Sequence, residues 1–93
     1  MIFKKFTYGD WELEVTSDNS ISVYNSGEFR EYTLDKIVEA KQSDELYEYV
    51  YFEHENETFT QVKFEIDNFL VIDLFDKEGE FLEEIGSHVF GED

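Results

Sequence analysis

Alternation between apolar and polar residues, interrupted at short intervals by turn-forming clusters, is the feature that most constrains the fold of this chain. In the segment WELEV, Trp11, Leu13 and Val15 occupy every second position, and glutamates fill the positions between them. Successive side chains of a β-strand point to opposite faces, so this pattern predicts a strand with one buried face. Trp11 is therefore expected in the core.

The same reasoning predicts further strands along the chain. Their segments are rich in β-branched and aromatic residues, which favour strands, and turn clusters such as Gly9-Asp10 and Ser26-Gly27 separate them. The expected strands cover residues 2–8, 11–15, 21–25, 28–32, 46–52, 58–66, 69–75 and 80–86. The later strands form a meander of hairpins, in which Gly79 suits a turn position with positive φ.

One segment changes its period. In TLDKIVEAK, Leu34, Ile37 and Val38 recur at the spacing of an amphipathic helix, and Thr33 is placed to cap its N-terminus. We therefore predict one helix over about residues 33–42, packed on the sheet. The expected fold class is α+β: a small, β-rich single domain over residues 1–93, with antiparallel hairpins and this one helix.

Length and composition limit the class of protein. The chain has 93 residues, of which 18% are aromatic, and this apolar bulk is typical of a folded domain rather than a disordered acidic tail. Cysteine is absent, which excludes disulfides and thiolate metal sites. The chain shows neither the apolar region of a signal peptide nor an apolar run of membrane-spanning length, so we expect a cytoplasmic protein without membrane contact.

Charge is the outstanding property of the composition. The formal net charge is −17, and residues 44–93 contain sixteen acids with only Lys63 and Lys77 as bases. A compact chain of this length has a diameter of roughly 32 Å, and duplex DNA carries one charge per about 1.7 Å, so the two charge densities are similar. Such a surface repels nucleic acid and anionic membranes and attracts basic proteins.

The stretch DELYEYVYFEHENE, residues 44–57, combines aromatic rings and acids. In a strand, its alternate tyrosines and the glutamates that follow them share a face, and tyrosine is a common interface anchor. Acids continue through the later hairpins, and neighbouring strands lie about 4.8 Å apart, so we expect one anionic, aromatic face that binds a partner. The alternative is a half-buried tyrosine ladder beside an ordinary solvated face. The predicted partner-binding residues are Glu45, Tyr47, Glu48, Tyr49, Tyr51, Glu53, Glu55, Glu57, Asp73, Asp76, Glu78, Glu80, Glu83 and Glu84.

Other kinds of site find little support. The segment DLFDKEGEFLEE is similar to a calcium loop, but Leu74 stands where the leading aspartate belongs, so a hairpin turn is predicted. His54 and His88 are interpreted as an exposed and a tail histidine, not as a zinc pair. Among 24 acids, carboxylate pairs are inevitable and do not indicate glycosidase chemistry. We expect no catalytic residue, no metal and no cofactor.

In size and charge the chain resembles the DNA-mimic inhibitors of phages and mobile elements, such as anti-CRISPR proteins, restriction inhibitors and uracil-DNA glycosylase inhibitors. These proteins share no fold or motif, so the resemblance assigns no residue. It implies a non-enzymatic protein that occupies a basic, nucleic-acid-binding surface of another protein, and that does not itself bind nucleic acid. The alternatives are an immunity protein or antitoxin against a cationic nuclease, and a small acidic accessory domain. An enzyme has the least support, and monomer and homodimer both stay open.

Overall fold

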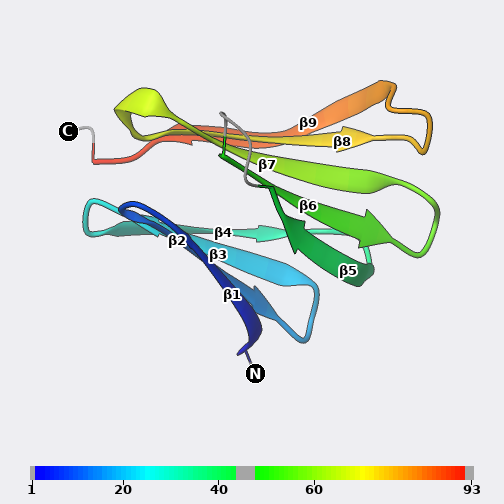
Figure 1. The fold of residues 1–93 in the computed structure, drawn as a ribbon, viewed down its shortest axis with the longest axis horizontal. Helices are drawn as coiled ribbons and strands as arrows, with labels where there is room; N and C mark the ends of the chain where they lie inside the picture. The colour runs from blue at the N-terminus through cyan, green and yellow to red at the C-terminus, as the bar shows by residue number, and fades with distance from the viewer. Residues whose placement is uncertain (1, 44–47, 92–93) are drawn as a thin grey trace.

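Two antiparallel sheets packed face to face make up the structure, a computed structural model that describes residues 2–43 and 48–91 (Figure 1). The first sheet contains β1 (Ile2–Tyr8), β2 (Trp11–Thr16), β3 (Ser20–Asn25) and β4 (Glu28–Thr33). The second contains β5 (Ile37–Gln42), β6 (Glu48–His54), β7 (Phe59–Glu65), β8 (Phe69–Phe75) and β9 (Phe81–Val89). A short 3₁₀ turn, η1 (Ile66–Asn68), joins β7 to β8. In both sheets the spatial order of the strands follows the sequence.

The hydrophobic core lies between the two sheets, where the inward positions of the alternating strands meet. Trp11 of β2 is 7% exposed, so its predicted place in the core is confirmed. Its ring contacts Phe64 of β7 at 5.0 Å between centroids and Phe90 at 5.3 Å, and these contacts join the sheets. Other buried residues are Phe6, Leu13, Val15, Ile21, Val23, Leu34, Ala40, Val50, Phe52, Val62, Leu70 and Ile72.

Every strand predicted from alternation overlaps a strand of the structure. The predicted hairpin turn between β8 and β9 is also present: the Asp76 N–H donates to the Glu80 carbonyl at 2.9 Å, and Gly79 has φ of 87°. In the described part of the chain, no helical segment has the length and apolar character that crossing a membrane requires.

The predicted helix over residues 33–42 is wrong, and so is the α+β class. The described residues are nearly all in strands, and they contain no helix of seven or more residues. Thr33 ends β4, and the segment that was expected to be helical forms β5 instead.

A β-bulge explains why β5 imitates a helical pattern. Ile37 lies opposite His54 on β6, whereas Glu39 lies opposite Glu53, so Val38 is an extra residue on β5. Because of the extra residue, the next side chain of β5 that points inward after Ile37 is Ala40, three residues later and not two. Both residues pack on the core. Val38 itself is 56% exposed. Of the three residues that predicted the helix, Leu34 thus lies in the link before β5, Ile37 packs on the core, and Val38 is the exposed extra residue of the bulge.

Residues 34–36 carry the chain from the first sheet to the second. The Leu34 N–H donates to the Asn19 carbonyl at 2.9 Å, and the Ile37 N–H donates to Asn19 Oδ1 at 2.9 Å. On the other side, the Glu55 N–H donates to the Lys36 carbonyl at 3.2 Å. The link, the β2–β3 turn, the β6–β7 turn and the β8–β9 hairpin therefore gather at one end of the molecule, at the right of Figure 1.

Candidate partner-binding face

The outer face of the second sheet, which points away from the first sheet, carries side chains in rows that cross the strands. Residues opposite one another on paired strands stand side by side, so the strand register defines each row. One row from β5 to β9 consists of Glu39, Glu53, Phe59, Phe75 and Phe81. The next row consists of Lys41, Tyr51, Gln61, Asp73 and Glu84. Each row contains both aromatic rings and carboxylates.

Aromatic rings form a continuous diagonal over this face, from β6 to β9. Tyr49 stacks on Tyr51 at 5.7 Å between centroids, and Tyr51 meets Phe59 edge-on at 6.2 Å. Phe59 stacks on Phe75 at 5.2 Å, and Phe75 meets Phe81 edge-on at 6.1 Å. We call these residues the aromatic band. Phe81 is 58% exposed, and rings that remain in contact with water on a sheet face are typical of interaction surfaces.

Carboxylates flank the aromatic band on both sides. Glu39 and Glu53 lie opposite each other on β5 and β6, and Asp73 and Glu84 lie opposite each other on β8 and β9. Partial burial raises the pKa of Asp73, the negative charge of Glu84 raises it further, and Lys63 opposes the change. Like charges directly opposite on paired strands destabilise a sheet. Lys41 Nζ lies 3.6 Å from Glu39 Oε1 and 3.9 Å from Glu53 Oε1, so a lysine bridges the first pair. The Asp73–Glu84 pair therefore remains as the one of the two that opposes the stability of the fold.

Further acids lie beside this face, at the end of the molecule where the β6–β7 turn and the β8–β9 hairpin lie. Lys36 Nζ lies 2.9 Å from Glu55 Oε2, and Lys77 Nζ lies 3.5 Å from Glu57 Oε2. All four side chains are more than 60% exposed, and exposed ion pairs contribute about 0–1 kcal/mol. These carboxylates are thus held only weakly by their lysines.

Asp76 has a structural role within the β8–β9 hairpin. Its Oδ1 accepts hydrogen bonds from the backbone N–H groups of Glu78 and Glu80, both at 2.9 Å. The aspartate therefore closes the turn and holds the two exposed glutamates in place.

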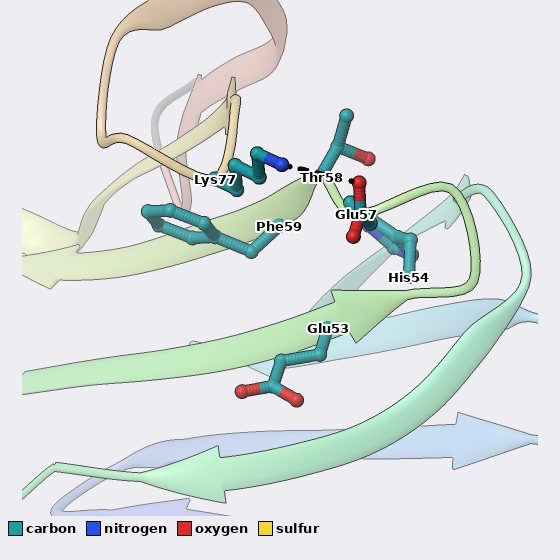
Figure 2. Close-up of a pocket in the computed structure, with 6 residues that line it drawn as sticks. All are labelled: Glu53, His54, Glu57, Thr58, Phe59 and Lys77. Carbon is teal, nitrogen blue, oxygen red and sulfur yellow. Dashed lines mark hydrogen bonds and ion pairs between the residues drawn. The ribbon is translucent and has the colours of Figure 1, made fainter.

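A depression surrounds Phe59, where the outer face of the second sheet meets the β6–β7 turn and the β8–β9 hairpin. One part of about 340 Å³ is lined by Glu53, His54, Glu57, Thr58, Phe59 and Lys77. An adjoining part of about 310 Å³ is lined by Lys41, Tyr51, Glu53 and Phe59. Figure 2 shows Lys77 above the Phe59 ring, the Glu57 carboxylate to its right and the Glu53 carboxylate below it. Glu53 and Phe59 line both parts, so we treat them as one feature and call it the Phe59 depression.

His54 is buried, so the expectation of an exposed histidine is wrong. It is 4% exposed and continues the inward phase of Val50 and Phe52. Its Nδ1 lies 3.2 Å from the Lys36 carbonyl, and its Nε2 lies 2.6 Å from Thr60 Oγ1. A carbonyl oxygen only accepts, so Nδ1 donates and, in the neutral ring, Nε2 accepts from the Thr60 hydroxyl.

His88 joins the two sheets. Its Nε2 lies 2.7 Å from Glu28 Oε2, and its ring meets Phe90 edge-on at 4.9 Å. Among the described residues, no group of three or more histidine, aspartate or glutamate side chains is arranged to hold a metal ion.

The structure divides the predicted partner-binding residues between separate places. Those on the outer face are Tyr49, Tyr51, Glu53, Asp73 and Glu84. Those in the β6–β7 turn and the β8–β9 hairpin are Glu55, Glu57, Asp76, Glu78 and Glu80. Glu83 lies opposite Leu74, on the other side of β9 from Glu84. Glu45, Tyr47 and the side chain of Glu48 lie outside the described residues.

Sequence reasoning does not identify several residues of this face, namely Glu39, Phe59, Phe75 and Phe81. Phe59 shares the phase of Gln61 and Lys63, and Phe75 shares the phase of Asp73, so a phenylalanine in the polar phase of its strand was the available signal. Glu39 was not identified because residues 33–42 were predicted to form a helix.

Comparisons of the chain with models of known protein families, with curated proteins and with solved structures find no match. The function proposed below therefore rests on the residues and geometry of this chain.

Proposed function

We propose that this protein is a non-enzymatic binding protein that occupies a basic, nucleic-acid-binding surface of another protein. The observation that carries the proposal is the aromatic band with carboxylates on both flanks. It lies on the side of the second sheet over which no other described strand passes (Figure 1). The carboxylates take the places of phosphates, and the rings take the places of bases and sugars against the partner.

Charge density supports this function. The longest dimension of the molecule is 37 Å, and duplex DNA of that length carries about 22 phosphate charges. The chain has a formal charge of −17. A partner shaped to bind DNA therefore meets a field of similar strength, which speeds association and makes it sensitive to salt. Because charge alone gives little specificity, the aromatic band supplies the desolvated contact area.

The arrangement of the acids also supports a binding role. Asp73 faces Glu84 in a like-charged cross-strand pair on this face, and the charge of Glu84 raises the pKa of Asp73. Such a pair lowers the stability of the free protein, and natural proteins commonly retain destabilising features where function needs them. A cationic partner removes the repulsion, so part of the binding energy comes from relief of this unfavourable interaction.

The test is capture of a partner by the immobilised protein from a bacterial lysate at low salt, with elution by duplex DNA. The face variant combines Glu53→Gln, Asp73→Asn and Glu84→Gln. We expect the wild type to retain a nucleic-acid enzyme or nuclease that DNA displaces, and the face variant to lose it.

A matched control separates the face from the net charge. The control variant combines Glu12→Gln, Glu14→Gln and Glu31→Gln, which lie on the outer face of the first sheet. It removes the same number of negative charges, and it should still capture the partner. Equal loss of capture by both variants, or capture of general basic proteins only, would show that charge serves solubility alone. A captured nuclease toxin would assign the immunity or antitoxin form of the same mechanism.

A further inference from the structure

We propose that the Phe59 depression receives one arginine side chain of the partner, with its guanidinium against the rings and its N–H groups on Glu53 and Glu57. The inference rests on the proposed function, because it assumes a basic partner. It goes further in naming the side chain that the partner inserts and the residues that receive it.

The rings provide a corner for a flat cation. Phe75 on β8 stacks on one side of Phe59, with 17° between the ring planes. Tyr51 lies on β6, which is the strand on the other side of β7, and its ring stands at 64° to Phe59. The side of Phe59 that faces β6 therefore lines the depression together with Tyr51. A cation placed against an aromatic face in such a corner is attracted by the ring quadrupole.

Carboxylates stand where the guanidinium would donate. Glu53 lies directly opposite Phe59 in the β6–β7 pairing, and Glu57 lines the depression from the β6–β7 turn. Guanidinium is planar and has five N–H donors, so it can stack on a ring and donate to carboxylates at its edge at the same time. The ammonium of lysine is a compact, strongly hydrated charge and cannot do both. The depression is thus suited to arginine rather than lysine.

Two of the protein's own lysines lie at the rim and compete for these carboxylates. Lys77 Nζ lies 3.5 Å from Glu57 Oε2, and Lys41 Nζ lies 3.9 Å from Glu53 Oε1 (Figure 2 shows the former pair). Both lysine side chains are about 60% exposed, so each pair is weak and is readily exchanged for a better donor. Removal of Lys77 should therefore strengthen arginine binding.

The test is a titration followed by NMR, with N-acetyl-arginine-N′-methylamide as the probe and the lysine analogue as its comparison. We expect saturable shifts at the rings of Phe59 and Tyr51 and at the side chains of Glu53 and Glu57, with several-fold tighter binding of the arginine probe. Lys77→Gln should tighten that binding by about two- to fivefold, as expected for loss of a competing surface ion pair.

Phe59→Leu should remove the preference for arginine, and Phe29→Leu is its matched control. Phe29 is 59% exposed and stacks on Tyr24 at 5.6 Å on the outer face of the first sheet, so its replacement should leave arginine binding unchanged. An amide spectrum of each variant establishes that it is folded. Equal shifts from both probes, spread over the acids of both sheets, would overturn the inference.

The two proposals can fail separately. If the probes show no arginine preference while the protein still captures a partner that DNA displaces, the depression has no such role and the proposed function stands. If arginine binds at Phe59 but the lysate yields no partner that DNA displaces, the Phe59 depression is an arginine site and the proposed function is wrong.

Discussion

The ionised side chain of Asp73 lowers the stability of the folded protein. Its pKa in the folded protein is raised above the ordinary value of 3.8, first by partial burial and then by the charge of Glu84. A carboxyl group whose pKa is raised by folding binds its proton more tightly in the native state. Its unfavourable contribution is therefore absent below about pH 3.8 and fully present once the pH exceeds the folded pKa.

We expect Asp73→Asn to increase the free energy of unfolding at pH 7 by a few tenths of a kcal/mol up to about 1 kcal/mol, the range of a cross-strand charge pair. Urea unfolding at pH 7 measures the change, and the gain should shrink as the pH is lowered toward 3.8. Asp18→Asn is the control, because a hydrogen bond from the Thr16 hydroxyl lowers the pKa of Asp18. That variant should lose stability at pH 7, although it removes the same charge. Gains of equal size in both variants would show that only net charge matters.

At the scale of single residues, burial could be predicted where local alternation indicates it, but not where it depends on partners from other segments of the chain. Trp11 alternates with two aliphatic residues, and its burial follows from that local pattern. His54 has the same inward phase as Val50 and Phe52, but glutamates on both sides suggested exposure. Its partners, Thr60 and the Lys36 carbonyl, come from other segments, and only the assembled fold shows that they satisfy a buried ring.

The β8–β9 hairpin presents Glu78 and Glu80, and Gly79 sets its shape. Gly79 has φ of 87°, and a Cβ added there would meet no atom within 4 Å. The effect of a substitution is therefore confined to the backbone. We expect Gly79→Ala to lower the free energy of unfolding by about 1 kcal/mol, and Gly79→Asn to lower it less, because asparagine tolerates left-handed backbone conformations. Urea unfolding compares the two, and equal losses would contradict this account of the turn.

At the scale of elements, the strands could be predicted and their arrangement could not. Each strand carries its own alternation, so the prediction needs only local sequence. The bulge in β5 interrupts that alternation at Val38, and only the pairing with β6 shows that Val38 is an extra residue of a strand and not part of a helix. The rows of the outer face likewise depend on register, which places Phe59 beside Glu53 and Phe75 through contacts between strands.

The molecule as a whole carries an excess of negative charge within dimensions of 37 × 29 × 24 Å. The Debye length is about 30 Å at 0.01 M salt and about 8 Å at 0.15 M, so repulsion spans the whole molecule in the first case and only near neighbours in the second. We expect the melting temperature at pH 7 to rise by several degrees between these salt concentrations. Differential scanning calorimetry measures it.

The same measurement close to pH 4 is the control, because about half of the carboxylates are then protonated and the net charge is small. The salt effect should nearly disappear there. A melting temperature that does not respond to salt at pH 7 would mean that the acids are individually paired, against the clustered arrangement of the outer face.

The chain passes between the two sheets once among the described strands, at residues 34–36, and we expect this single passage to shape the order of folding. Strands within each sheet pair with their neighbours in sequence, so each meander can grow by closing successive hairpins, which is fast for a β-protein. Neither meander can bury its apolar side by itself, because Leu13 and Val23 of one sheet are covered by the other. We therefore expect the docking of the two sheets to be the late step of folding, and the short link at residues 34–36 to keep the halves close to each other until they dock.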